Sequence, residues 1–395
     1  MELTAVPDSS SALRIALVRQ RYNPFGGAER FVERALAALV AEGAEITLIT
    51  RCWEGAEQSG FRQVLCDPPY SHFWGGRAAR DRSFARAAAD EMANGGYDIT
   101  QSHERIPGCM VFRAGDGVHA AWLAQRGRVL SRAARLAEKL SPYHRYVLAA
   151  ERAMYAHANL RAVICNSRMV ADELRRYYGV GEDKLHVIYN GVDTDDFHPR
   201  LVERREAVRL GLGFGRHSPL LLFVGGGFAR KGIPQLLHAF AGMARNDAEL
   251  LVIGNDRKLA AMQRLAEQLG IGGRVRFVGA VKDVRPFFGA ADAFVLPTLY
   301  DPFPNAAIEA LACGLPILTT TACGAAELVR LGENGWVVDA LDVTTMSARL
   351  DDLCVLAGDA GARQAARQAA EALTLPAMSA RLLALYRDLA GTRPA

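Results

Sequence analysis

Short apolar segments alternate with amphipathic helical segments along this chain, and this alternation constrains the fold more than any other feature. Residues 14–20 predict a buried strand, and the loop that follows contains Gly26 and Gly27. Apolar residues then recur at helical spacing over 28–40, and residues 46–50 predict a second strand. The order strand, loop, helix, strand requires a parallel sheet with a right-handed crossover connection.

The same alternation continues and then restarts in the second half of the chain. Because helices alternate with short β-branched strands in both halves, the chain is predicted to be an α/β protein with two doubly wound, Rossmann-like units. The first half adds expected strands at 97–101, 109–113, 162–166 and 184–189, and a long helical region at about 119–158. The second half has expected strands at 220–224, 249–253, 275–278, 293–297, 317–320 and 335–338, with helices at 233–243, 259–269, 284–290 and 305–313.

The length of 395 residues agrees with two domains, since a domain usually has roughly 100–200 residues. Residues 1–190 are the predicted N-terminal domain and 217–375 the predicted C-terminal domain. The polar stretch 191–216, with its Gly, Asp and Pro residues, is the expected interdomain linker. Residues 376–395 are expected to form a C-terminal helix that packs back on the N-terminal domain.

Composition excludes several classes of protein. Half of the residues are hydrophobic and 23% are charged, which is typical of a globular chain. A net charge of +4 gives no indication of nucleic-acid binding. No uninterrupted apolar run of about 18 residues and no signal-peptide pattern is found, so a cytoplasmic location is expected. The seven scattered cysteines contain no C-x-x-C pair and are expected to be reduced, mostly buried thiols.

Two glycine-containing loops each follow a strand and precede a helix. Gly26 and Gly27 are compatible either with backbone contact to a phosphate or with a tight turn alone. The second loop, GGGFARKG at 225–232, holds Arg230 and Lys231. Cations are poorly placed at a helix start, where the helix dipole is already positive, so this arrangement favours binding of a diphosphate.

Asp301 and Glu309 form a D-x7-E pattern in the segment LPTLYDPFPNAAIEALACG. The first lies in a loop after a strand and the second in the following helix, so both can line the carboxyl edge of the sheet, where such folds bind ligands. Carboxylates accept hydrogen bonds from sugar hydroxyls. The alternative is a capping acid and a solvated helical Glu, but the small and apolar neighbours of Glu309 argue against simple solvation.

Asp193 and Asp195 spell a D-x-D sequence, which in other nucleotide-sugar enzymes can hold a metal ion. The pair lies in the polar linker, far in sequence from both glycine loops. Turn and capping chemistry explains it better, so no metal site is predicted.

Between residues 121 and 152 there are seven Arg or Lys residues against two Glu. This excess is compatible with a solvated helical face. It is also compatible with contact to an anionic membrane or a phosphorylated lipid. The predicted membrane and acceptor patch consists of Arg128, Arg132 and Arg135.

Together these motifs resemble the retaining glycosyltransferases of family 4, over nearly the whole chain. The specific elements are NGVDTDDFHP at 190–199, RKG at 230–232, and the D-x7-E pattern followed by ALACGLPIL. The resemblance implies a GT-B fold, with two Rossmann-like domains facing across a cleft. The segments YNPFGGAERF, CWEG and SHERIPGCMVFRAGDGVH narrow it to the lipopolysaccharide core glucosyltransferase type, which acts on an inner-core heptose.

The resemblance also implies roles for individual residues. Arg230 and Lys231 would neutralise the donor diphosphate, Glu309 would bind the ribose, and Asp301 would bind sugar hydroxyls. Asp116 lies where this type carries an acid on the acceptor side, and it would orient the acceptor or act as base. The remaining donor-binding residues would be Gly26, Gly27, Val281 and the backbone amides of Asn305 and Ala306.

Three positions depart from the family pattern. Asp301 replaces the usual Glu, Gly225-Gly226 replaces a Gly-Arg, and Pro304 removes one backbone N–H near the sugar site. These departures concern the identity of the donor more than its binding.

The function implied is retaining transfer of a hexose, with UDP-glucose as the favoured donor, to a lipopolysaccharide inner-core heptose. The enzyme would work at the inner face of the cytoplasmic membrane as a peripheral protein. Neither metal, cofactor nor nucleic acid is expected. The alternatives are a GT-B nucleotide-sugar epimerase or hydrolase, a family 4 enzyme with another glycan acceptor, and a noncatalytic sugar-nucleotide-binding protein.

Overall fold

The structure is a computed structural model that describes residues 12–22, 40, 43–53, 61–70 and 76–391. The chain divides into two compact units, which we call unit 1 and unit 2. Unit 1 comprises residues 1–113, 139–164 and 379–395, and unit 2 comprises residues 114–138 and 165–378. The domain boundaries expected from the sequence stay predictions.

The first sheet has seven strands in the order β5-β3-β1-β6-β7-β8-β9, and its register is parallel from β5 through β8. The central strands β1, β3 and β6 are buried along nearly their whole length because both faces of the sheet are covered. The sequence did not indicate β5. The strands are β1 (Arg14–Val18), β3 (Glu45–Thr50), β5 (Arg62–Leu65), β6 (Ile99–Ser102), β7 (Val111–Arg113), β8 (Ala162–Cys165) and β9 (Leu185–Val187).

Helices α2 (Gly76–Asn94) and α6 (Arg168–Tyr178) were also not expected from the sequence. The C-terminal helix α14 (Leu375–Gly391) contributes Tyr386, whose hydroxyl donates a hydrogen bond to Gln101 at the end of β6. A small separate sheet pairs β2 (Arg21–Tyr22) with β4 (Cys52–Trp53) in parallel.

The helical region expected at about 119–158 is three helices: α3 (His119–Gly127), α4 (Arg132–Leu140) and α5 (Pro142–Tyr155). The helical character expected for this region is confirmed, and the structure adds that the region is divided into three helices. The break before α5 has a local cause, because Pro142 has no N–H and cannot continue a helix. Ser141 caps the new helix by accepting a hydrogen bond from the backbone N of His144.

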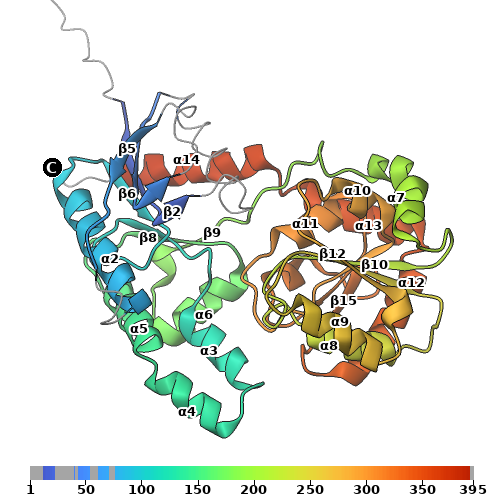
Figure 1. The fold of residues 1–395 in the computed structure, drawn as a ribbon. Helices are drawn as coiled ribbons and strands as arrows, with labels where there is room; N and C mark the ends of the chain where they lie inside the picture. The colour runs from blue at the N-terminus through green and yellow to red at the C-terminus, as the bar shows by residue number, and fades with distance from the viewer. Residues whose placement is uncertain (1–11, 23–39, 41–42, 54–60, 71–75, 392–395) are drawn as a thin grey trace, which may run out of the picture. The chain divides into compact units, whose positions relative to one another are not determined.

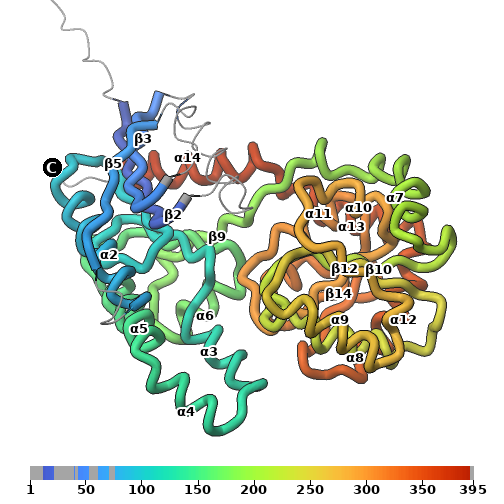
Figure 2. The backbone as a smooth tube through the Cα atoms, viewed as in Figure 1, coloured from blue at the N-terminus to red at the C-terminus, as the bar shows by residue number. Residues whose placement is uncertain are grey.

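The second sheet, in unit 2, has six parallel strands in the order β12-β11-β10-β13-β14-β15. Helices α8, α9 and α12 cover one face of this sheet, and helices α10, α11 and α13 cover the other (Figures 1 and 2). The strands are β10 (Leu220–Val224), β11 (Glu249–Ile253), β12 (Val275–Gly279), β13 (Ala293–Val295), β14 (Ile317–Thr320) and β15 (Gly335–Val338). The helices are α8 (Ile233–Ala241), α9 (Leu259–Gln268), α10 (Arg285–Ala290), α11 (Asn305–Ala312), α12 (Val343–Leu356) and α13 (Ala360–Glu371).

This strand order positions the site. The chain runs outward from β10 to β11 and β12, and then returns to place β13 on the other side of β10. The order in which the chain adds strands therefore changes direction between β10 and β13, although all the strands stay parallel. In open α/β sheets, ligands bind in the crevice at the carboxyl ends of the strands at this switch point.

The polar segment before the second sheet contains two helices, η3 (Pro199–Arg204) and α7 (Arg205–Leu212). Arg209 in α7 is only 1% exposed and is among the largest fully buried side chains described. Its guanidinium is ion-paired with Asp292 at 2.6 Å and also donates to backbone carbonyls, which include that of Ala290. A charged side chain thus anchors this segment to the folded body of unit 2.

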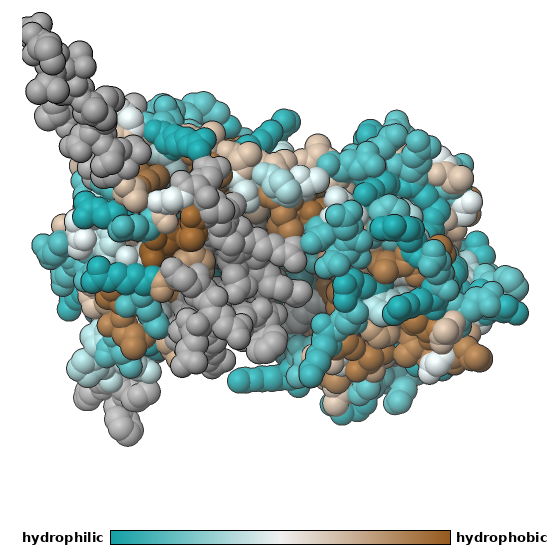
Figure 3. All heavy atoms as spheres, turned by 90° about the horizontal axis from the view of Figure 1, so that it is seen from above, coloured by the Kyte–Doolittle hydropathy of each residue, from teal (hydrophilic) through white to brown (hydrophobic). Residues whose placement is uncertain are grey.

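The state of the cysteines and the polarity of the surface are those expected from the composition. All seven cysteines are free and five of them are buried, as expected. The face drawn in Figure 3 is mainly hydrophilic, with smaller apolar patches. Across the described ranges, no helix has both the length and the apolar character needed to span a membrane.

Candidate active site

The loop after β10 brings Arg230 and Lys231 to the switch point of the second sheet. Gly225 adopts a φ of +148°, and a Cβ at this position would lie 2.6 Å from Lys231 Nζ, so glycine makes room for the lysine. The backbone carbonyl of Arg230 accepts hydrogen bonds from Leu299 N at 2.8 Å and Thr298 Oγ1 at 3.1 Å. The loop after β10 is therefore joined directly to the loop after β13.

Asp256, in the loop after β11, fixes the glycine loop from the other side. Its carboxylate accepts hydrogen bonds from the backbone N of Lys258 at 2.7 Å and of Phe228 at 2.9 Å. The amide of Lys258 lowers the pKa of Asp256 most; partial burial opposes this, and the amides of Phe228 and Gly227 lower the pKa further. Because the folded pKa is depressed, the stabilisation is present above the unfolded pKa and is lost as the pH falls through the folded one.

Asp301 lies between the two cations. Its Oδ2 atom is 3.2 Å from Arg230 Nη1 and 3.7 Å from Lys231 Nζ. Asp301 is 8% exposed, and Arg230 also donates to the backbone carbonyl of Tyr300 at 2.8 Å. The Arg230–Lys231–Asp301 cluster therefore holds two positive charges against one negative charge, and its excess positive charge suits an anionic ligand.

Helix α11 begins four residues after Asp301 and has Pro304 as its N-cap, with no side-chain capping bond. Asn305 Oδ1 accepts a hydrogen bond from Asn190 Nδ2 at 2.8 Å, and Asn190 also donates to the carbonyl of Phe303. Glu309 is half-buried in this helix, as its small and apolar neighbours suggested. Asn190, in the segment before the second sheet, thus holds both the loop before α11 and the first turn of that helix.

Asp116 is exposed at a turn after β7 and belongs to unit 2. Val118, which follows Gly117 in the same loop, donates its backbone N–H to the hydroxyl of Tyr300 at 2.9 Å. Tyr300 directly precedes Asp301. The side chain of Tyr300 therefore connects the Asp116 loop to the Arg230–Lys231–Asp301 cluster.

The other residues singled out from the sequence have separate placements. Gly26 and Gly27 lie outside the described residues, and Val281 and Ala306 are half-buried. Arg128 pairs with Asp339 at 2.9 Å, whereas Arg132 and Arg135 are exposed on α4.

The D-x-D sequence takes part in a turn. Asp193 Oδ1 accepts hydrogen bonds from the backbone N of Asp195 at 3.2 Å and of Asp196 at 3.1 Å. This is the Asx-type turn chemistry that the sequence suggested. Within the described part of the chain, no group of three or more His, Cys, Asp or Glu residues is arranged to hold a metal ion.

Sequence reasoning missed Tyr300, Asn190 and Asp256. Tyr300 and Asn190 lie inside the motifs quoted for the family resemblance, but a tyrosine or an asparagine carries no spacing signal of its own. Asp256 follows a strand end directly after Gly254-Asn255, and this position was the signal that could have found it.

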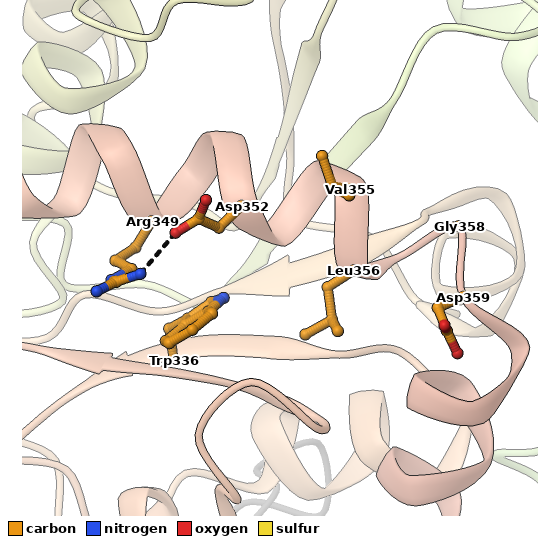
Figure 4. A pocket seen from close by; sticks show the side chains of 7 residues that line it. All are labelled: Trp336, Arg349, Asp352, Val355, Leu356, Gly358 and Asp359. Carbon is orange, nitrogen blue, oxygen red and sulfur yellow. Dashed lines mark hydrogen bonds and ion pairs between the residues drawn. The ribbon is translucent and has the colours of Figure 1, made fainter.

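A hollow of about 740 Å³ lies between α12 and the edge strand β15 (Figure 4). The guanidinium of Arg349 stacks over the Trp336 ring at 4.2 Å and pairs with Asp352 at 2.7 Å. The rest of its wall consists of Val355, Leu356, Gly358 and Asp359. None of the residues predicted for the donor or the acceptor lines this hollow.

Comparison with known proteins agrees with this arrangement. Residues 25–196 match the Glycosyltransferase Family 4 model, and residues 205–372 match the model described as Glycosyl transferases group 1. The chain is 28% identical to lipopolysaccharide glucosyltransferase WaaG of Escherichia coli, covering 82% of this chain and 84% of that protein. It is also 28% identical to D-inositol 3-phosphate glycosyltransferase of Xylanimonas cellulosilytica, covering 94% and 93%.

Two solved structures show the same fold. The crystal structure of WaaG superposes with a TM-score of 0.79 at 23% identity, covering 94% of this chain and all but 1% of that one. Anabaena HepE in complex with UDP-glucose gives a TM-score of 0.67 at 18% identity, covering 95% of this chain and all of that one. With a family 4 match in its first half, a group 1 match in its second and this fold throughout, the chain belongs to the GT-B glycosyltransferases.

Proposed function

We propose that this glycosyltransferase moves glucose from UDP-glucose to a heptose of a lipopolysaccharide inner core, with retention of configuration. The observation that carries the proposal is the Arg230–Lys231–Asp301 cluster at the switch point of the second sheet. The similarity to WaaG supports glucose as the sugar and a lipopolysaccharide as the acceptor class, because that relative is named as a lipopolysaccharide glucosyltransferase.

The cluster suits the chemistry of a departing nucleoside diphosphate. Negative charge builds up on the diphosphate as the bond to the sugar breaks, and preorganised cations stabilise that charge most in the transition state. Arg230 and Lys231 supply the two cations, and the uncapped start of α11 adds the positive end of a helix dipole. Asp301 orients both cations and, in this proposal, exchanges part of that pairing for sugar hydroxyls.

Retention requires that the acceptor attacks the face of the sugar from which the diphosphate leaves. In the proposed reaction the acceptor hydroxyl forms the new bond to the anomeric carbon, the bond from that carbon to the diphosphate oxygen breaks, and the acceptor proton moves to the leaving phosphate. Asp116 orients the acceptor hydroxyl. Glu309 binds the ribose of the donor.

A matrix of donors and acceptors tests this function. UDP-, ADP- and GDP-glucose and UDP-galactose are each incubated with heptose-terminated lipopolysaccharide, with inositol 3-phosphate or without acceptor, and the products are identified by mass spectrometry and anomeric NMR. We expect one α-linked hexose on the lipopolysaccharide, from UDP-glucose only. Free glucose or an epimerised donor without acceptor would instead identify a hydrolase or an epimerase, and transfer to inositol 3-phosphate would contradict the proposed acceptor.

We propose that the reaction needs no metal ion, because Arg230 and Lys231 take the place of a divalent cation at the diphosphate. Turnover should therefore be unchanged after dialysis against EDTA. The measurement is the initial rate before and after chelation, with Mg²⁺ or Mn²⁺ added back. If chelation abolished the activity and either ion restored it, the reaction would need a metal ion, and Asp193 and Asp195 would be the first candidates for its ligands.

Peripheral attachment to an anionic membrane, at the inner face of the cytoplasmic membrane, is part of the proposal, and α4 is the element that supports it. None of its residues is buried, and Leu136 and Leu140 are 60% and 63% exposed. These leucines share one helical face with two alanines, while Arg132 and Arg135 lie on another. An apolar face flanked by basic residues is typical of a helix that lies in the membrane interface.

Replacing Arg132 and Arg135 together by Gln should weaken binding to anionic vesicles by about 2 kcal/mol, or roughly 30-fold, since each basic residue at such a surface contributes about 1 kcal/mol. Binding should also weaken steeply with salt. The measurement is sedimentation with phosphatidylglycerol-containing vesicles and with neutral phosphatidylcholine vesicles.

The matched control is the double variant Arg264→Gln and Arg381→Gln, which removes the same charge from exposed positions on α9 and α14. It should bind anionic vesicles like the unmodified protein. Equal affinity for neutral and anionic vesicles, or equal losses in both double variants, would assign α4 to an ordinary solvated helix.

A further inference from the structure

Tyr300 is buried where the loop after β13 meets the loop that carries Asp116. The residue is only 2% exposed, and its hydroxyl both accepts and donates a hydrogen bond. The hydroxyl accepts a hydrogen bond from Val118 N at 2.9 Å and donates one to Glu173 Oε2, on α6, at 2.6 Å. The backbone carbonyl of the same residue accepts the hydrogen bond from Arg230 Nη1.

The approach of the two loops is built into the backbone at Gly117. This residue has a φ of +71°, and a Cβ there would lie 2.3 Å from Tyr300 Oη and 2.7 Å from Pro302 Cγ. Only glycine satisfies both conditions. Trp122, in the first turn of α3, packs against the Tyr300 ring with centroids 6.3 Å apart. Tyr300 therefore packs directly against the Asp116 loop, which is also held by a hydrogen bond from Asn166 Nδ2 to the carbonyl of Gly115 at 3.1 Å.

We propose that Tyr300 is a positioning residue for glycosyl transfer. Its phenol fixes the position of Asp116 through the hydrogen bond to Val118 N, and its carbonyl fixes the position of the Arg230 guanidinium. Asp116 on the acceptor side and Arg230 on the donor side are thereby held at one separation. The hydrogen bond to Glu173 orients the phenol so that its lone pair faces Val118 N. This inference rests on the proposed role of Asp116 toward the acceptor, and it concerns transfer rather than donor binding.

The substitution Tyr300→Phe removes one oxygen and keeps the ring, the carbonyl and Asp301. We expect kcat for transfer to fall by roughly 10- to 100-fold, the loss that a misplacement of about 1 Å can produce. The affinity for UDP, measured by calorimetry, should be unchanged because the Arg230–Lys231–Asp301 cluster remains intact. Glu173→Ala should reproduce the loss, and Glu173→Gln, which keeps an acceptor oxygen, should restore most of the rate.

Tyr189→Phe is the matched control, because it removes another tyrosine hydroxyl that donates to a glutamate of unit 2, Glu327, at 2.8 Å. It should keep the kcat of the unmodified protein. A readout that is independent of activity is amide hydrogen exchange in the peptide that contains Val118. Exchange there should accelerate in Tyr300→Phe and not in Tyr189→Phe, because only the first variant removes the acceptor of that amide.

An unchanged kcat in Tyr300→Phe, a parallel loss of UDP affinity, or unchanged exchange at Val118 would each overturn the proposal. Failure of the proposed function is a different result. In that case the unmodified protein does not transfer glucose to the heptose acceptor, and the comparison of variants is made with the donor and acceptor that the matrix identifies. The exchange measurement needs neither substrate.

Discussion

Replacing either Lys231 or Arg230 by alanine is expected to lower kcat/KM by on the order of 10²-fold or more, the effect of removing one preorganised charge from a leaving group. The structure refines this expectation. With both cations present, the Arg230–Lys231–Asp301 cluster carries one excess positive charge. With one cation removed the cluster is neutral, and with both removed the buried carboxylate of Asp301 is left to repel the diphosphate.

The double variant should therefore lose more activity than the two single variants would lose together if each substitution acted independently. Adding Asp301→Asn to the double variant should recover part of the affinity for UDP. The readouts are initial rates and calorimetric binding, with circular dichroism to verify folding. Arg285→Ala is the matched control, since Arg285 is an arginine of the same unit that pairs with Asp283 and Asp196 at the surface. Wild-type turnover by a folded double variant would refute the assignment of this cluster to the leaving group.

The parts of the fold that the sequence predicted are those where pattern and packing agree. Strands β10, β11, β14 and β15 have the residues expected from the sequence, because strands covered on both faces are rich in apolar and β-branched residues. The D-x7-E segment was predicted to line the carboxyl edge of the sheet, where such folds bind ligands, and the glycine loop follows a strand of the same sheet. The two segments meet in the contact between Arg230 and Asp301.

The parts that the sequence did not predict depend on contacts between distant segments. Strand β5 is an edge strand whose residues are mostly exposed, so it lacks the apolar run that marks a strand. The break between α4 and α5 depends on one Ser-Pro pair inside a continuous Ala, Arg and Leu pattern. Tyr300 joins segments 182 residues apart in its bond to Val118, and no local spacing encodes such a pair.

Arg209 is the largest departure from a sequence expectation, because a charged residue of the polar linker is almost fully buried. The guanidinium donates to the carbonyls of Gly215 and Ser218 at 3.1 and 2.8 Å, in addition to that of Ala290. Asp292, its ion-pair partner, also accepts a hydrogen bond from the backbone N of Leu220, the first residue of β10. Through these bonds the arginine ties the start of the second sheet to α7 and α10.

Replacing Arg209 by Met should lower the free energy of unfolding of unit 2 by about 3–5 kcal/mol, because removing one partner leaves a buried carboxylate and several buried carbonyls without their donor. Arg205→Met is the matched control: it removes a second ion pair with the same Asp292, from a position that is 23% exposed, and should cost only about 1 kcal/mol. Urea unfolding followed by tryptophan fluorescence measures both. Adding Asp292→Leu to Arg209→Met should restore only part of the loss, since the carbonyls and the N–H of Leu220 stay unsatisfied. Equal destabilisation by the two arginine variants would mean that the network of Arg209 contributes no more than a surface ion pair, and that the apolar core of the sheet alone holds the segment in place.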